Sequence, residues 1–220
     1  MQHNIPRAEY PRPQLVRNEW LNLNGTWEYM TDRGMSGEMR GFANGAEFTE
    51  QITVPFCRES VLSGIGDTDF CNCVWYRKKI TLPAGWQGGK RVLLHIGACD
   101  YKTDVWVNGK WIDYHIGGYV SFTMDITKAL TEGENAITIR AIDDLRTGNQ
   151  PAGKQSPRYE SFGCFYTRTT GIWQTVWLEF APKAYIESVK YVTDVENATL
   201  NITAEVSGAG TFTAEATYEG

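Results

Sequence analysis

The side chains in this sequence that could form disulfides or bind a metal ion are its five cysteines and three histidines. The cysteines are odd in number and irregularly spaced, which does not indicate a disulfide framework; they are Cys57, Cys71, Cys73, Cys99 and Cys164. Cys71 and Cys73 stand two residues apart, so they would share one face of a strand rather than form the CxxC clamp of a zinc site. We therefore expect reduced thiols, no metal site and no cofactor.

Five tryptophans lie in runs of β-forming residues, and their side chains have two interpretations. A pyranose packs its C–H face on an aromatic ring, so each tryptophan could be a platform for a sugar. Large aromatic side chains in strands also pack the interior of a sandwich or cover its faces, and we favour this second interpretation. The five are Trp75, Trp106, Trp111, Trp173 and Trp177.

Composition and charge exclude several classes of protein. Of the 220 residues, 42% are hydrophobic and 21% are charged, which is enough apolar material for a sizeable core. The net charge of −5 gives no basic footprint, so we expect neither nucleic acid nor a membrane as partner. The start of the chain, Met1–Arg7, has no apolar segment of the kind that a secretory signal contains. We therefore expect a cytoplasmic protein, or a periplasmic one if a signal peptide has been removed.

Short alternating runs bounded by glycine and proline predict an all-β protein with a two-sheet sandwich. The dipeptide Asn108-Gly109 predicts a hairpin with a type I′ turn. A single helical turn is expected at Asp125–Leu130, with Asp125 as its N-cap. The strands are expected at 25–30, 52–54, 74–82, 91–96, 103–107, 110–116, 119–124, 135–142 and 173–180.

Three segments outside these strands have a different character. The first twenty residues are polar and proline-punctuated, which predicts an extended arm that lies over the sandwich. Residues 145–170 form a long glycine- and proline-rich loop, and loops of this length are usually functional or disordered. After Pro182, thin alternating runs at 186–192, 199–206 and 211–217 are similar to the opening of an immunoglobulin-type sandwich. Such a domain needs about 100 residues, so we predict a first domain at 1–182 and a truncated second at 183–220.

Several short motifs, each weak alone, are specific together because they follow one order and spacing. They are Asn22–Trp27, Val74–Lys78, Asp104–Lys110, His115–Tyr119, Asp125–Thr127, Gly133–Asn135 and Arg168–Leu178. This set resembles the sugar-binding domain of glycoside hydrolase family 2, the β-galactosidase, β-glucuronidase and β-mannosidase group, over about residues 20–182. The resemblance implies a jelly-roll (galactose-binding-like) β-sandwich, followed by an immunoglobulin-like domain and a catalytic (β/α)₈ barrel.

The same resemblance implies that this chain contains no catalytic residue. In that family the acid/base and the nucleophile are two glutamates of the barrel, and a barrel needs about 250 residues. Asn18-Glu19 has the same residue types as the family's acid/base dipeptide, but it lies in the proline-rich arm, so we treat the match as coincidence.

Loop residues of this domain carry the functional expectation, because in some family members these loops extend to the barrel and help form the sugar pocket. By position, the candidates for substrate binding are Asp69, Asn72, Glu160, Tyr166 and Arg168. The alternative is that they are ordinary solvated loop residues, with Arg168 in a buried ion pair to a loop carboxylate. Related galactosidases carry an acidic residue shortly before the equivalent arginine, where this chain has Phe165-Tyr166-Thr167.

We therefore expect the non-catalytic N-terminal domain of a β-galactosidase-like exo-glycosidase, which buttresses the barrel and lends loops to the sugar pocket. Its partner would be a β-glycoside, bound mostly by the barrel, and the parent enzyme could be a homo-oligomer. Two alternatives stay open: an autonomous carbohydrate-binding module, since the fold class also serves lectins, and a purely structural interaction domain.

Overall fold

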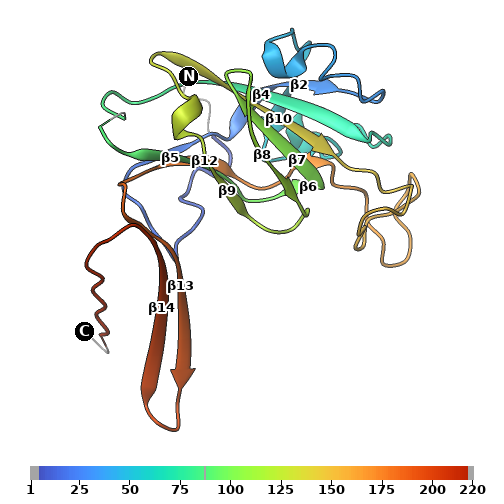
Figure 1. Ribbon diagram of the computed structural model, residues 1–220. Coiled ribbons are helices and arrows are strands. Elements are labelled where there is room, and N and C mark those ends of the chain that lie inside the picture. The colour runs from blue at the N-terminus through green and yellow to red at the C-terminus, as the bar shows by residue number, and fades with distance from the viewer. Residues whose placement is uncertain (1–4, 87, 218–220) are drawn as a thin grey trace.

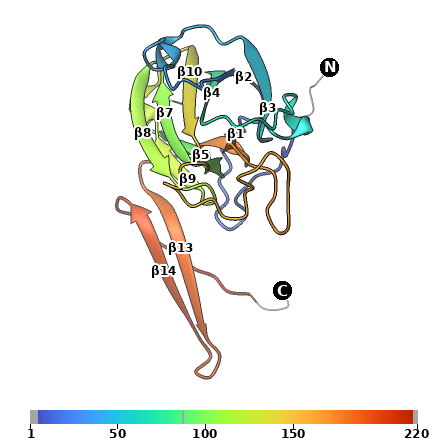
Figure 2. The same cartoon turned by 90° about the vertical axis from the view of Figure 1, so that its right-hand side faces the viewer.

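The computed structural model is an all-β sandwich from which one hairpin projects, as Figures 1 and 2 show. It describes residues 5–86 and 88–217, so the first part of the segment Met1–Arg7 lies outside the described residues. Every strand pair is antiparallel. The all-β sandwich predicted from the sequence is confirmed. Within the described ranges, no helix combines the length and apolar character needed to cross a bilayer.

Two sheets form the sandwich. The larger has the order β3 (Glu50–Val54), β2 (Gly25–Thr31), β4 (Cys73–Thr81), β10 (Glu134–Ile142), β7 (Lys102–Val107) and β8 (Lys110–Ile116). The smaller has the order β1 (Trp20–Asn22), β12 (Val176–Ala181), β5 (Arg91–Ile96) and β9 (Phe122–Asp125). Two two-stranded sheets complete the fold: the short pair β6 (Cys99–Asp100) with β11 (Gly171–Ile172), and the long hairpin β13 (Tyr185–Asp194) with β14 (Thr199–Ser207).

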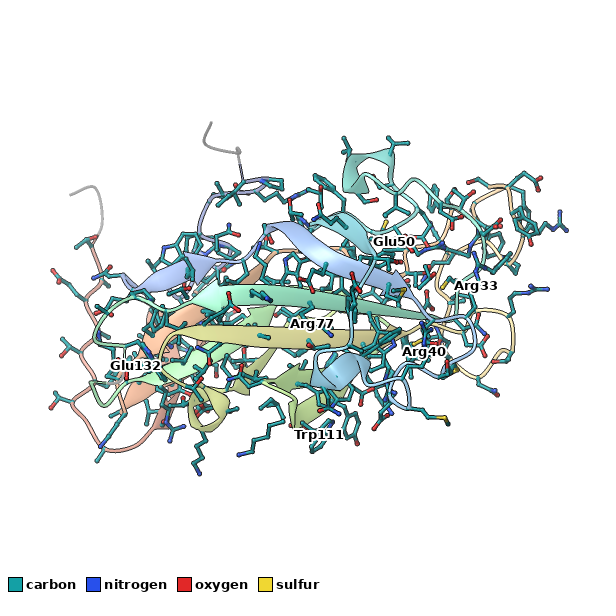
Figure 3. All side chains as sticks on the ribbon, turned by 90° about the horizontal axis from the view of Figure 1, so that it is seen from above. Arg33, Arg40, Glu50, Arg77, Trp111 and Glu132 are labelled. Atoms are coloured by element: carbon teal, nitrogen blue, oxygen red, sulfur yellow. The ribbon has the colours of Figure 1, made fainter. Side chains whose placement is uncertain are left out.

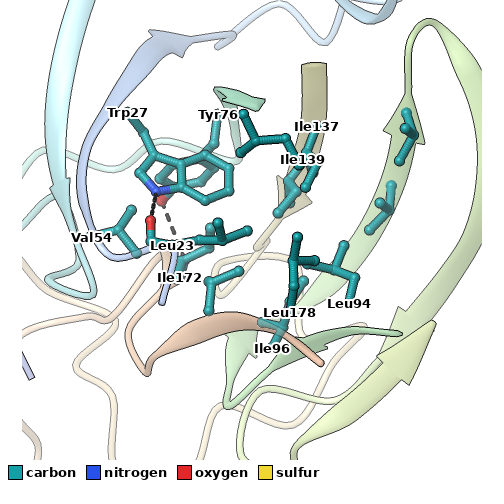
Figure 4. Close-up of a cluster of buried hydrophobic side chains, with 14 of the residues drawn as sticks. Leu23, Trp27, Val54, Tyr76, Leu94, Ile96, Ile137, Ile139, Ile172 and Leu178 are labelled. Atoms are coloured by element: carbon teal, nitrogen blue, oxygen red, sulfur yellow. Dashed lines mark hydrogen bonds between the residues drawn. The ribbon is translucent and has the colours of Figure 1, made fainter. Parts of the chain in front are cut away.

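The core lies between the two sheets because alternate residues of each strand point inward. Trp27 and Tyr76 from the larger sheet pack with Leu94 and Leu178 from the smaller one (Figure 4). The indole Nε1 of Trp27 donates to the Leu23 carbonyl at 2.8 Å, so this buried polar atom is satisfied.

A second, smaller cluster lies on the outer face of the larger sheet. There Trp75 and Trp106 stack under the short 3₁₀ helix η1 (Phe42–Asn44). Trp177 is also buried, whereas Trp173 is half-buried and Trp111, at the sheet edge in Figure 3, is 51% exposed. Interior packing therefore holds for three of the five tryptophans, whereas Trp111 lies on the surface of the sheet.

The turn prediction at Asn108-Gly109 is confirmed, because both residues have positive φ, 52° and 77°. The helical turn is the 3₁₀ helix η3 (Thr127–Ala129), and its N-cap is Ile126 rather than Asp125. The Asp125 carboxylate still accepts the Thr127 N–H at 3.0 Å, so it performs the expected role from one residue earlier.

Three strand predictions need correction. The run 119–124 is extended only from Phe122, because the preceding residues form the turn that leads from β8 into β9. The run 173–180 begins at Val176, since the N–H groups of Trp173 and Gln174 donate to the Ala98 carbonyl instead of joining the ladder. The run 211–217 is not a strand in this structure. Alternation alone does not make a strand without a paired edge.

The N-terminal arm (residues 5–19) lies against the smaller sheet, as predicted, and Glu179 of β12 is the group that holds it. The Tyr10 hydroxyl donates to this carboxylate. Arg12 and Arg17 approach it at 3.1 and 2.7 Å, and His95 Nε2 lies 3.1 Å away. Burial alone would raise the pKa of Glu179, but the hydrogen bonds and the charges around it lower that pKa far below its ordinary value.

We predict that Glu179→Gln destabilises the chain, because it leaves two arginines without the counter-charge of this buried carboxylate. The expected loss in the free energy of unfolding at pH 7 is about 3 kcal/mol, measured by urea unfolding with tryptophan fluorescence. Since the folded pKa of Glu179 is lowered, its stabilisation is present above pH 4.5 and declines as the pH falls below it. The exposed Glu187→Gln is the control, and a loss below about 0.5 kcal/mol for both variants would contradict the prediction.

Candidate functional site

The two loops that carry the predicted site residues meet at one end of the sandwich, and Arg168 joins them. Its guanidinium is buried and donates to the carbonyl of Thr68 in one loop and to that of Arg158 in the other. It also lies 4.0 Å from the centroid of the Phe70 ring. The partners of Arg168 are therefore carbonyl oxygens and an aromatic face, not the loop carboxylate that we expected as the alternative.

Asp69 and Asn72 are held by their backbones in the first loop (57–72). The Asp69 carbonyl accepts from Arg58, while its carboxylate is exposed and lies 3.8 Å from Arg33. The Asn72 carbonyl accepts the Asp143 N–H at 2.9 Å, and its side chain is half-buried.

Glu160 and Tyr166 are held in the same way in the second loop (145–170). The Tyr166 N–H donates to the Lys154 carbonyl, and the Tyr166 carbonyl accepts from Ser156, both at 2.7 Å. The Glu160 carbonyl accepts from the Ser156 hydroxyl at 2.8 Å. The side chains of Glu160 and Tyr166 are exposed. Both loops therefore combine an ordered backbone with exposed polar side chains, namely those of Asp69, Glu160 and Tyr166, the arrangement that a ligand-contacting surface requires.

Beneath these loops lies a group of three buried carboxyls that the sequence analysis missed. This acid cluster consists of Glu59, Asp100 and Asp143, which are 8%, 1% and 3% exposed. No pattern in the sequence groups these three acids or marks Glu59 and Asp100 as buried, because they come from three separate segments. The one local signal is the position of Asp143 at the end of the mostly buried strand β10.

The acid cluster fastens the second loop to the sandwich. Thr170 donates its N–H to Glu59 at 3.1 Å and its hydroxyl to Asp143 at 3.0 Å. Gln155 donates to Asp100 at 2.7 Å. Gly118 passes so close that a Cβ there would lie 2.2 Å from Asp100 Oδ1. A residue without a side chain is therefore needed at position 118 for this close approach.

Burial changes the acidity of the cluster. Burial raises the pKa of Asp100 to about 6, and burial together with the charge of Asp100 raises that of Asp143 to about 7. The pKa of Glu59 is also raised by burial. All three carboxyls therefore take up protons at a higher pH than solvated carboxyls do. In the described part of the chain, no group of three or more Cys, His, Asp or Glu residues is arranged to hold a metal ion, and the five cysteines are free.

We predict that Arg168→Met separates the two loops, because the carbonyls of Thr68, Ser156 and Arg158 lose their bonds to this guanidinium. Hydrogen bonds to a charged donor contribute about 1.5–3 kcal/mol each, so hydrogen exchange in 57–72 and 145–170 should rise by at least tenfold. Arg158→Met is the matched control, since the exposed Arg158 side chain packs only on Phe162 in the second loop. Unchanged exchange in both loops of Arg168→Met would show that this guanidinium does not join them.

We also predict that Asp143→Asn stabilises the protein at pH 8 and not at pH 4. The folded pKa of about 7 lies above the unfolded 3.8, so the native state binds more protons and loses stability as pH rises between these values. An amide imitates the protonated form: its oxygen accepts from Gln150 and its NH₂ donates to Thr170. The gain should be on the order of 1–2 kcal/mol in urea unfolding, against none for the exposed Asp113→Asn. An equal effect of Asp143→Asn at both pH values would refute the assignment.

The sequence also has relatives. The β-glucuronidase of Paenibacillus borealis is 26% identical over 85% of this chain and 33% of its own length. That of the dog, Canis lupus familiaris, is 29% identical over 86% of this chain and 33% of its own length. The chain thus spans about a third of the length of the curated relatives it matches. The galactosidase-like expectation finds no support in these relatives.

Comparison with solved structures agrees with the fold. The β-glucuronidase of Ruminococcus gnavus in complex with uronic deoxynojirimycin superposes with a TM-score of 0.70 at 21% identity. The match covers 91% of this chain and 36% of the other. The family model "Glycosyl hydrolases family 2, sugar binding domain" matches residues 64–182, which is more than half of the chain and includes the second loop and the end of the first. With the ordered motifs, the sandwich and this match together, the chain belongs to the sugar-binding domain family of glycoside hydrolase family 2.

Proposed function

We propose that this chain is the non-catalytic N-terminal domain of a family 2 exo-glycosidase of the β-glucuronidase type. It braces the catalytic barrel and lends its two loops to one wall of the sugar pocket. One observation carries the proposal: buried groups fix the backbones of both loops, while the side chains suited to a sugar stay exposed. Asp69, Glu160 and Tyr166 then offer acceptors and a donor at defined positions.

The energetics of the loops support this role. A buried guanidinium and three buried carboxyls are costly features, and a loop that merely connects strands does not need them. Their effect is to remove conformational freedom from the segments that carry the polar side chains. A site ordered before its ligand arrives loses less entropy on binding. The same arrangement therefore suits a wall that meets substrate.

The sugar is proposed from two observations. The matched relatives are named β-glucuronidases, and the segment Phe165–Thr167 lacks the acidic residue that related galactosidases place before the equivalent arginine. We therefore favour a β-glucuronide over a β-galactoside as the substrate of the parent enzyme.

The β13–β14 hairpin fits the beginning of a second sandwich. Cross-strand pairs such as Tyr191 with Ile202 and Val189 with Ala204 place apolar side chains on one face. The pair Lys190 with Thr203 lies on the other. Tyr191 is 61% exposed, so the apolar face lacks a complete cover among the described residues. In our proposal an immunoglobulin-like domain begins after residue 182, and its second sheet packs on this apolar face.

The first test concerns catalysis by the chain alone. Incubated with 4-methylumbelliferyl β-glucuronide or β-galactoside, the purified chain should release no fluorophore above the buffer rate. Hydrolysis that scales with protein concentration would overturn the non-catalytic assignment.

The second test concerns the loops in the enzyme that joins this domain to a barrel. Tyr166→Phe and Asp69→Asn should each raise KM for the β-glucuronide about 5- to 20-fold, the loss of one ligand hydrogen bond, with unchanged unfolding midpoints. The control is Glu132→Gln, an exposed residue at the opposite end of the sandwich from Arg33 (Figure 3). Unchanged KM and kcat in both loop variants would leave the domain a purely structural role. If the isolated chain binds the sugar and these substitutions abolish that binding, the chain is instead an autonomous binding module.

A further inference from the structure

We propose that the cleft between the N-terminal arm and the end of the smaller sheet binds an acidic saccharide. This arm cleft has a volume of about 690 Å³, within the range of pockets that hold small ligands, about 300–1,000 Å³. None of the five predicted loop residues lines it, so the inference goes beyond the proposed function. The lining residues used below are Arg7, Tyr10, Arg12, Ser121, Trp173 and Gln174.

The roof of the arm cleft is an ordered segment of the arm. Asn22 Nδ2 donates to the Arg7 carbonyl at 2.9 Å, and Asn24 Nδ2 donates to the Pro6 carbonyl at 3.0 Å. The Tyr10 hydroxyl is bound by Glu179 and by the Leu15 carbonyl. The cleft therefore exists before a ligand arrives, and binding does not have to order its roof.

The floor includes an aromatic ring held in a fixed orientation. Trp173 Nε1 donates to the Gly118 carbonyl at 2.8 Å, which satisfies its one polar atom. Its ring packs edge-on against Tyr119, with 6.2 Å between centroids. The indole is only half-buried, and it lines the cleft. An apolar ring face of this kind is a suitable surface for the C–H face of a pyranose.

Polar side chains flank this ring. Gln174 and Ser121 are both exposed and line the cleft, so their amide and hydroxyl groups are available to sugar hydroxyls. The absence of a side chain at Gly97 makes room for Gln174, because a Cβ there would lie 2.8 Å from the Gln174 Cβ. An aromatic floor with a few convergent polar groups has the composition of a carbohydrate site.

The charge balance selects the class of saccharide. The charged side chains that line the arm cleft are two arginines, Arg7 and Arg12, and one acid, Glu9. His95 adds no charge at neutral pH because burial lowers its pKa. The carboxylate of Glu179, which pairs with Arg12, lies outside the lining and is also paired with Arg17. The arm cleft is therefore net positive in a chain of net charge −5, and this local field favours a carboxylate-bearing sugar.

The test is a calorimetric titration of the purified chain with digalacturonate, with cellobiose as the neutral probe. We expect saturable binding of digalacturonate that weakens at least fivefold in Arg7→Ala, in Gln174→Ala and in 0.5 M NaCl. Both substituted side chains are exposed, and equal unfolding midpoints verify that the variants fold. Trp111→Ala, on the larger sheet, and Asp69→Asn, in the first loop, should bind like the unaltered chain.

Three results would overturn the inference. They are no saturable binding, equal affinity for cellobiose, and binding that neither Arg7→Ala nor Gln174→Ala weakens. None of these results changes the KM effect expected of Tyr166→Phe and Asp69→Asn in the parent enzyme. The two experiments can therefore refute saccharide binding in the arm cleft and the proposed function independently of each other.

Discussion

One buried carboxylate, that of Glu179, determines how the N-terminal arm, the smaller sheet and the hairpin meet. Groups from Tyr10, Arg12 and Arg17 reach it across about 160 residues of sequence. Two arginines and several donors offset the cost of removing this charge from water. Arg17 also donates to the Ile186 carbonyl at the start of β13. The same interaction thus fixes the roof of the arm cleft and ties the hairpin to the sandwich.

The buried carboxyls beneath the loops have the opposite pKa shift to Glu179. Among the described residues, the three carboxyls there have no arginine partners of the kind that Glu179 has. Burial raises the pKa of Asp100 to about 6 and that of Asp143 to about 7. Thr170 and Gln155 of the second loop donate hydrogen bonds to these carboxyls, and these bonds attach the loop to the sandwich. Glu179 contributes stability as a charge, whereas the acid cluster is most favourable when it is protonated. Acid therefore has opposite effects on the two groups.

The sequence predicted well what depends on neighbours along the chain. Alternation located most strands, and the Asn108-Gly109 dipeptide identified its turn because positive φ is a local requirement. The residues that position the candidate site depend on partners far away: Arg168 contacts Thr68, and Asp143 contacts Thr170. The residue type alone does not show whether an acidic side chain is buried or solvated. Only the fold shows that Glu59 and Asp100 are inside.

The sandwich and the hairpin differ in what stabilises them. The sandwich encloses an apolar core between two sheets, so it satisfies the usual condition for folding on its own. The hairpin has only two strands and leaves Tyr191, Leu200 and Val206 about half exposed or more, and an isolated two-stranded hairpin is marginal in water. Its link to the sandwich through Arg17 is polar and therefore does not cover the apolar face. We infer that the hairpin depends on a neighbour for stability, and that an added apolar surface would order it without altering the sandwich.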